Sequence, residues 1–163
     1  VEDMLTSASV PEDRPIIACH VGSPVPRKRW PTPRFATLIE RLTDEGAHVI
    51  LVGGVTEDIL AREVLDVTNA KPTDLSGRTT FEQLAAVLRR CACFVGNDSA
   101  PMHLAAAVGV PTIGLFFATD PKRFGPRGPS ASVVQADNVH ALTVDAVLEA
   151  IHSSWAPRDS APE

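Results

Sequence analysis

The chain has 163 residues, of which 44% are hydrophobic and 21% charged, and its formal net charge is −5. This length corresponds to about one domain, and the composition is that of a globular protein rather than a disordered chain. The acidic balance argues against a nucleic-acid partner. No uncharged apolar run approaches the ~18 residues of a membrane span, and residues 1–13 lack the basic-then-apolar order of a signal peptide.

Along the chain, short apolar strands alternate with amphipathic helices. Strands are predicted at residues 16–21, 47–52, 73–75, 91–95, 111–116 and 132–135. Helices are predicted between them, with Thr32, Thr56, Thr80 and Thr143 as N-caps and an alanine-rich helix over residues 100–108. We expect one folded domain over residues 15–153, with flexible tails at residues 1–14 and 154–163.

The strands are continuously apolar rather than alternating, which predicts a parallel sheet covered by helices on both faces. The fold class is therefore α/β, with a Rossmann-like, doubly wound sheet. Such sheets bind ligands at the carboxyl ends of the strands, near the point where strand order reverses. The chemistry is then expected in the loops at residues 22–31, 53–57, 96–103 and 117–128.

The loop after the first strand contains the adjacent cations Arg27, Lys28 and Arg29. Lysine and arginine at this edge suit an anionic ligand, although a solvated basic turn explains the charges about equally well. Trp30 is interpreted as a hydrophobic anchor of the loop rather than a stacking platform.

The loop at residues 96–103 leads directly from a strand into the beginning of a helix. The free N–H groups and positive dipole of a helix N-terminus favour a phosphate. Ser99 and His103 lie four residues apart and could reach one ligand. Taken alone, an N-cap at Asp98 or Ser99 and a packed His103 explain the segment at least as well.

Weaker signals surround these two loops. Gly53 and Gly54 allow close backbone approach, and Glu57 could hold a ribose diol, although a tight turn with a helix cap is an equal explanation. His20 is interpreted as a core histidine. Cys91 and Cys93 have no partner pair for zinc, and with Cys19 they indicate buried thiols in a reducing, cytoplasmic compartment.

Together these segments resemble the bacterial heptosyltransferase family, glycosyltransferase family 9, in the order and spacing of its carboxyl-terminal half. The specific part is Gly-Asn-Asp-Ser-Ala-Pro-Met-His at residues 96–103. It is supported by Lys-Arg-Trp-Pro at 28–31, Val-Gly-Gly with Glu57 at 52–57, Leu-Ser-Gly-Arg-Thr at 75–79 and Thr-Asp-Pro at 119–121. One difference is Ser99-Ala100, where the family commonly has Thr-Gly.

The resemblance implies one half of a GT-B glycosyltransferase, the half that binds a nucleotide-sugar donor, with ADP-heptose expected. It implies inverting, metal-independent transfer to a lipopolysaccharide-type or other glycan acceptor, with acceptor and general base supplied by the other domain. By position, Lys28 and Ser23 would contact the diphosphate, Gly53 and Glu57 the ribose end and Asp98 the sugar. Ser99, Ala100 and His103 would also bind the diphosphate. Lys28 and Asp98 are the expected catalytic residues, and no metal or other cofactor is expected.

The resemblance also implies that the chain alone binds donor without transferring sugar, in the cytoplasm or at the inner face of the cell membrane. Two other functions stay open on the sequence. One is half of a GT-B-like sugar-nucleotide epimerase, and the other is a non-catalytic module that binds a nucleotide or phosphate.

Overall fold

The computed structural model describes residues 1–155. Its strands are β1 (Ile16–His20), β2 (His48–Leu51), β3 (Thr73–Asp74), β4 (Cys93–Asn97), β5 (Thr112–Phe116) and β6 (Ala131–Gln135). Its helices are α1 (Glu2–Ser7), α2 (Thr32–Asp44), α3 (Asp58–Val67), α4 (Phe81–Leu88), α5 (Ala100–Ala107), α6 (Pro121–Phe124) and α7 (Val144–Ser154). Two 3₁₀ turns, η1 (Pro26–Lys28) and η2 (Val55–Glu57), follow β1 and β2.

The six strands form one parallel sheet in the order β3-β2-β1-β4-β5-β6. The chain builds outward from β1 to β3 and then returns to β4 on the other side of β1. Order therefore reverses between β1 and β4, where Cys19 pairs with Val95 and His20 with Gly96. This is the predicted α/β, Rossmann-like, doubly wound architecture, and a ligand at the carboxyl edge beside the reversal stays a prediction.

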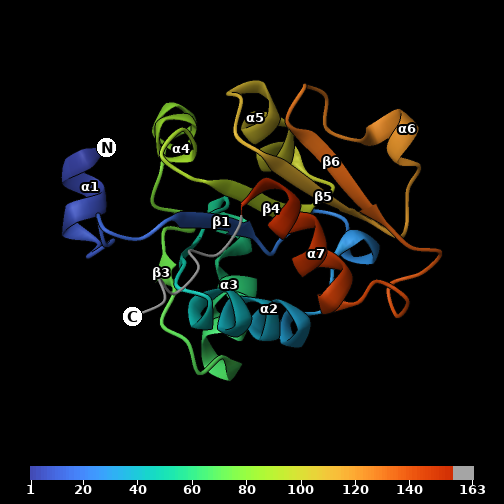
Figure 1. Cartoon of the computed structure of the whole chain (residues 1–163), viewed down its shortest axis with the longest axis horizontal. Coiled ribbons are helices and arrows are strands. Elements are labelled where there is room, and N and C mark those ends of the chain that lie inside the picture. The colour runs from blue at the N-terminus through green and yellow to red at the C-terminus, as the bar shows by residue number, and fades with distance from the viewer. Residues whose placement is uncertain (156–163) are drawn as a thin grey trace, which may run out of the picture.

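Helices cover both faces of the sheet (Figure 1). Ile17 and Cys19 of β1 are buried in a core with α2, α3 and α7, whereas Ile16 and Ala18 are buried in a second core with α1, α4 and α5. Alternate β1 side chains thus enter opposite layers, and both layers are apolar. Burial on both faces explains why the sequence shows apolar runs instead of alternation.

Two of the four predicted caps are confirmed and two are wrong. Thr80 forms a capping box with Gln83, and the Thr143 hydroxyl accepts the Ala146 N–H at 3.2 Å. By contrast, Thr32 is the first residue of α2 after Pro31. Thr56 lies inside η2, so that α3 begins only at Asp58. In neither case does the threonine make a capping bond, and at η2 the Glu57 side chain accepts the Gly54 N–H instead.

Parts of both predicted tails are helical in the structure. Residues 2–7 form α1, and Leu5 and Val10 are buried against the sheet, because this segment covers apolar residues at the beginning of β1. Of the predicted tail at 154–163, Ser154 belongs to α7, and residues 156–163 lie outside the described residues. The flexibility of both tails, and the domain boundaries at residues 15 and 153, stay predictions.

The three cysteines are buried and free, as predicted. Burial raises the pKa of Cys91 and of Cys93 to about 12, so both are uncharged thiols at neutral pH. Within residues 1–155, no helix has the length and apolarity needed to cross a membrane.

Candidate donor site

A cavity of about 650 Å³ lies at the carboxyl edge of the sheet. The loops after β1, β2, β3 and β4 all contribute to its wall, as the doubly wound topology requires. Its lining residues are Ser23, Pro24, Val25, Lys28, Gly53, Gly54, Thr56, Glu57, Thr79, Thr80, Phe81, Leu84, Asp98, Ser99, Ala100, Pro101 and His103.

All of the predicted site residues line this one cavity: Ser23, Lys28, Gly53, Glu57, Asp98, Ser99, Ala100 and His103. The structure therefore brings together residues that are up to 80 positions apart between Ser23 and His103. Their roles toward a ligand stay predictions. The basic segment at residues 122–123 does not line the cavity. The Arg123 guanidinium lies instead 5.1 Å from the centroid of the Phe124 ring.

Lys28 is the only predicted cation of its loop that lines the cavity, among the described residues. Its Nζ lies 2.7 Å from Asp98 Oδ2, and the Thr119 hydroxyl donates to the same oxygen at 3.0 Å. The side chains of Lys28 and Asp98 are only 19% and 8% exposed. A partly buried pair is weakly screened by salt, and here the two opposite charges are in direct contact and partly offset one another.

Asn97 fixes the basic loop, a role that the sequence analysis missed. Its Oδ1 accepts the Trp30 N–H at 3.0 Å, and its Nδ2 donates to the Val21 and Gly22 carbonyls at 3.2 and 3.1 Å. Trp30 is fully buried and donates from Nε1 to the Leu142 carbonyl at 2.9 Å, which confirms its interpretation as an anchor. These contacts hold the loop containing Lys28 beside β4.

The β4–α5 junction presents a helix N-terminus to the cavity. Ser99 is the N-cap residue, and Ala100 and His103 of α5 are exposed. The Ser99 hydroxyl is directed inward, because it donates to the Asn97 carbonyl at 2.9 Å and lies 2.9 Å from His20 Nδ1. His103 thus does not pack on the sheet, and backbone rather than the Ser99 side chain faces the space.

Glu57 meets the fully buried His20 at the inner end of the cavity. Glu57 Oε2 lies 2.7 Å from His20 Nε2 and accepts the Gly54 N–H at 3.0 Å. Burial acts to raise the pKa of Glu57, but the bonds from His20 and Gly54 outweigh it and hold this pKa below its ordinary value. Glu57 is therefore a carboxylate at neutral pH.

Two glycines make room for this pair. A Cβ on Gly22 would lie 2.7–2.9 Å from carbons of the Glu57 side chain. A Cβ on Gly53 would lie 2.9 Å from Glu57 Oε2 and 3.1 Å from His20. The sequence analysis expected Gly53 to let a ligand approach the backbone. In the structure the absence of a side chain at Gly53 also makes room for the Glu57 carboxylate.

His20 is a core histidine, as predicted, and it is the last residue of β1. Its two nitrogens contact two of the predicted site residues. The one available signal was its position at the carboxyl end of a strand, directly before the first ligand loop.

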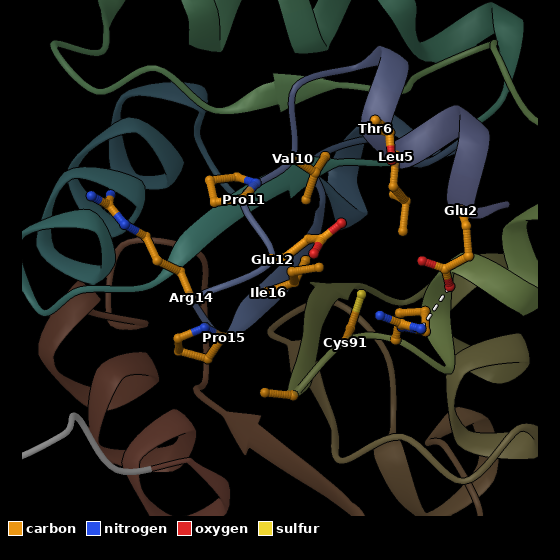
Figure 2. A pocket seen from close by; sticks show the side chains of 12 residues that line it. Glu2, Leu5, Thr6, Val10, Pro11, Glu12, Arg14, Pro15, Ile16 and Cys91 are labelled. Atoms are coloured by element: carbon orange, nitrogen blue, oxygen red, sulfur yellow. Dashed lines mark hydrogen bonds and ion pairs between the residues drawn. The ribbon is translucent and has the colours of Figure 1, made fainter.

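A second, smaller cavity of about 230 Å³ lies at the opposite, amino edge of the sheet. Figure 2 shows Leu5 and Val10 on one side of it and Ile16 and Cys91 on the other. An exposed ion pair joins Arg90 Nη1 to Glu2 Oε1 at 2.6 Å. None of the predicted site residues lines this cavity.

The sequence of the chain matches the profile of "Glycosyltransferase family 9 (heptosyltransferase)" over residues 2–149. The chain belongs to glycosyltransferase family 9. It is 30% identical over 172 aligned residues to lipopolysaccharide heptosyltransferase 2 of Salmonella typhimurium, an alignment that covers 92% of this chain and 49% of that protein. The predicted family is therefore confirmed.

Solved structures agree with this membership. The Escherichia coli ADP-heptose LPS heptosyltransferase II superposes with a TM-score of 0.85 at 28% identity, covering 93% of this chain and 50% of that one. The chain spans about half the length of these relatives. Which half it corresponds to stays a prediction.

One solved structure with the same fold contains iron. An iron-containing dodecameric glycosyltransferase of E. coli H10407 shares the fold, with a TM-score of 0.55 at 20% identity over 74% of this chain and 30% of that one. Within residues 1–155, no group of three or more His, Cys, Asp and Glu side chains could hold a metal ion together. A metal-free reaction stays a prediction for this chain.

Proposed function

We propose that the chain is the donor-binding half of an inverting, metal-independent glycosyltransferase that takes a sugar from a nucleoside diphosphate sugar. The observation that carries this proposal is the single cavity at the β1–β4 reversal, where four loops gather every predicted donor-site residue. Membership of glycosyltransferase family 9 supplies the reaction class. The printed name of the E. coli neighbour makes ADP-heptose the first donor to test.

The cavity offers a complementary surface for each part of such a donor. Lys28 and the beginning of α5 are positively polarised and suit the diphosphate. The Glu57 carboxylate suits ribose hydroxyls, and Phe81, which is 65% exposed at the rim, suits the face of a base. Asp98, beside Lys28, is then placed to accept hydrogen bonds from the sugar.

Charge development explains how this arrangement assists transfer. The acceptor hydroxyl oxygen attacks the anomeric carbon, and the bond to the β-phosphate oxygen breaks with its electron pair on the leaving diphosphate. Lys28 and the α5 N-terminus stabilise this charge in place of a bound cation. Attack from the opposite face inverts the anomeric centre, and the base that takes the hydroxyl proton belongs to the acceptor half.

Calorimetric titration of the 163-residue chain with ADP, UDP, GDP and ADP-heptose tests the proposal. ADP and ADP-heptose are expected to bind more tightly than UDP and GDP. In an activity assay with ADP-heptose and a lipopolysaccharide-type acceptor, the chain alone is expected to transfer no sugar. Undetectable binding of all four nucleotides would overturn donor binding. Transfer by the chain alone would overturn the assignment of the base to another domain.

A further inference from the structure

His20 connects two parts of the cavity that are far apart in sequence. It is fully buried at the end of β1, with Nδ1 2.9 Å from Ser99 Oγ and Nε2 2.7 Å from Glu57 Oε2. Ser99 is the N-cap residue of α5, and Glu57 is the last residue of η2. One ring therefore spans the space between the helix N-terminus and the carboxylate.

Both partners of His20 make further hydrogen bonds that hold them in place. The Ser99 hydroxyl donates to the Asn97 carbonyl at 2.9 Å, and the same oxygen lies 2.9 Å from His20 Nδ1. Glu57 Oε2 already accepts the Gly54 N–H at 3.0 Å and is ionised, so it also accepts from Nε2–H. His20 thus has an oxygen within hydrogen-bond distance of each ring nitrogen, and Glu57 Oε2 is held by both the ring and the Gly54 N–H.

A serine, histidine and carboxylate also form the nucleophilic triads of hydrolases. In such a triad the serine hydroxyl donates to the histidine base. Here the Ser99 hydroxyl donates to backbone instead, and the residue is only 8% exposed. The geometry therefore favours a support for the cavity wall over an attacking nucleophile.

We propose that His20 is a positioning residue that holds Glu57 in place for the ribose hydroxyls and ties it to the Ser99 end of the diphosphate site. This inference rests on the proposed donor function. Glu57 stands on a short 3₁₀ turn, which constrains a side chain less than a long helix does. The buried imidazole and the cleared space at Gly22 and Gly53 fix its carboxylate.

Two single substitutions separate the two bonds of His20. In His20→Gln the amide nitrogen takes the place of Nε2 and keeps the bond to Glu57. In His20→Asn the amide takes the place of Nδ1 and keeps only the bond to Ser99. Each variant loses one buried bond, so a purely structural role predicts similar effects of both.

The readout is the ratio of affinities for ADP and 2′,3′-dideoxy-ADP, measured by calorimetry on the full chain. The wild type is expected to bind ADP about ten- to hundredfold more tightly than dideoxy-ADP, because hydrogen bonds from the ribose hydroxyls to the charged Glu57 contribute about that much affinity. His20→Gln is expected to keep this ratio within about threefold. His20→Asn is expected to bring the ratio to about one.

The outcomes separate the two proposals. No binding of ADP by the wild type overturns the donor function, and this inference with it. ADP binding without a preference over dideoxy-ADP overturns the inference alone, as does an unchanged ratio in His20→Asn or an equal change in both variants.

A second measurement does not depend on how the variants fold. In ¹⁵N NMR of the wild-type chain, ADP is expected to shift the signal of His20 Nε2 more than dideoxy-ADP does. Equal shifts with the two nucleotides, or none with either, would overturn the positioning role.

Discussion

The sheet has a hollow at each edge, and each hollow has an ion pair of about the same length. At the carboxyl edge Lys28 and Asp98 are 2.7 Å apart with side chains 19% and 8% exposed. At the amino edge Arg90 and Glu2 are 2.6 Å apart but 51% and 65% exposed. Contact distance therefore does not distinguish the two pairs, whereas burial does.

This difference in exposure indicates which edge of the sheet can bind a charged ligand. Exposed pairs are screened and contribute about 0–1 kcal/mol, whereas partly buried charges keep their strength. The amino-edge hollow is lined by exposed charged residues and by buried apolar residues of the core, such as Leu5 and Val10. We therefore expect substitutions at the carboxyl edge to change nucleotide binding, and substitutions at the amino edge to change stability.

Lys28→Ala should have the largest effect on binding. Removal of the cation deprives the diphosphate of a charge-assisted bond and leaves Asp98 facing it, so ADP affinity should fall about ten- to hundredfold. Calorimetry with ADP measures the change. Arg27→Ala is the matched control, because Arg27 is an exposed cation of the same turn that does not line the cavity. Equal losses in both variants would contradict the assignment.

Leu5→Ala should show the opposite behaviour. Leu5 is 6% exposed in the core beneath α1, and truncation of a buried leucine at the wall of an existing cavity should lower the free energy of unfolding by about 2 kcal/mol. Urea denaturation measures this loss, with the exposed Thr6→Ala of the same helix as a near-neutral control. ADP affinity should stay at the wild-type value below the transition, and a weakened affinity would remove the contrast between the edges.

Glu57→Gln should reveal a smaller, pH-dependent effect. The folded state holds the pKa of Glu57 below its ordinary value of 4.5, so ionised Glu57 stabilises the fold fully well above pH 4.5. This contribution is lost as the pH falls through the lowered, folded-state pKa. The difference in unfolding free energy between wild type and variant should shrink on acidification. Denaturation from about pH 7 to pH 3 tests it, and a constant difference would contradict it.

Local patterns were enough to predict the parallel sheet and most of the loops at its edge. The parallel direction of the strands follows from alternation of apolar runs with helices, and the Thr80 capping box determined where α4 begins. The same topology made the gathering of Lys28 and Glu57 at one edge predictable. These features depend on short-range sequence and on general rules of parallel sheets.

The remaining features depend on contacts between distant residues. Asn97 binds carbonyls 75 and 76 residues away, and His20 binds partners 37 and 79 residues away. No local spacing encodes such pairs. Likewise, α1 has only six residues, and its place is set by burial of Leu5 against distant elements rather than by helix propensity.

Arg90→Ala should have the smallest effect and gives the sharpest test of the burial argument. Its pair with Glu2 is as short as the Lys28 pair, but both side chains are more than half exposed. The unfolding free energy should therefore change by less than about 0.5 kcal/mol, and ADP affinity should not change. Urea denaturation at low and high salt, with Glu2→Ala and the double variant, measures the coupling directly. A coupling free energy above about 1 kcal/mol for Arg90 and Glu2 would show that an exposed ion pair is as strong as a partly buried one. Exposure would then be the wrong criterion for separating the two edges.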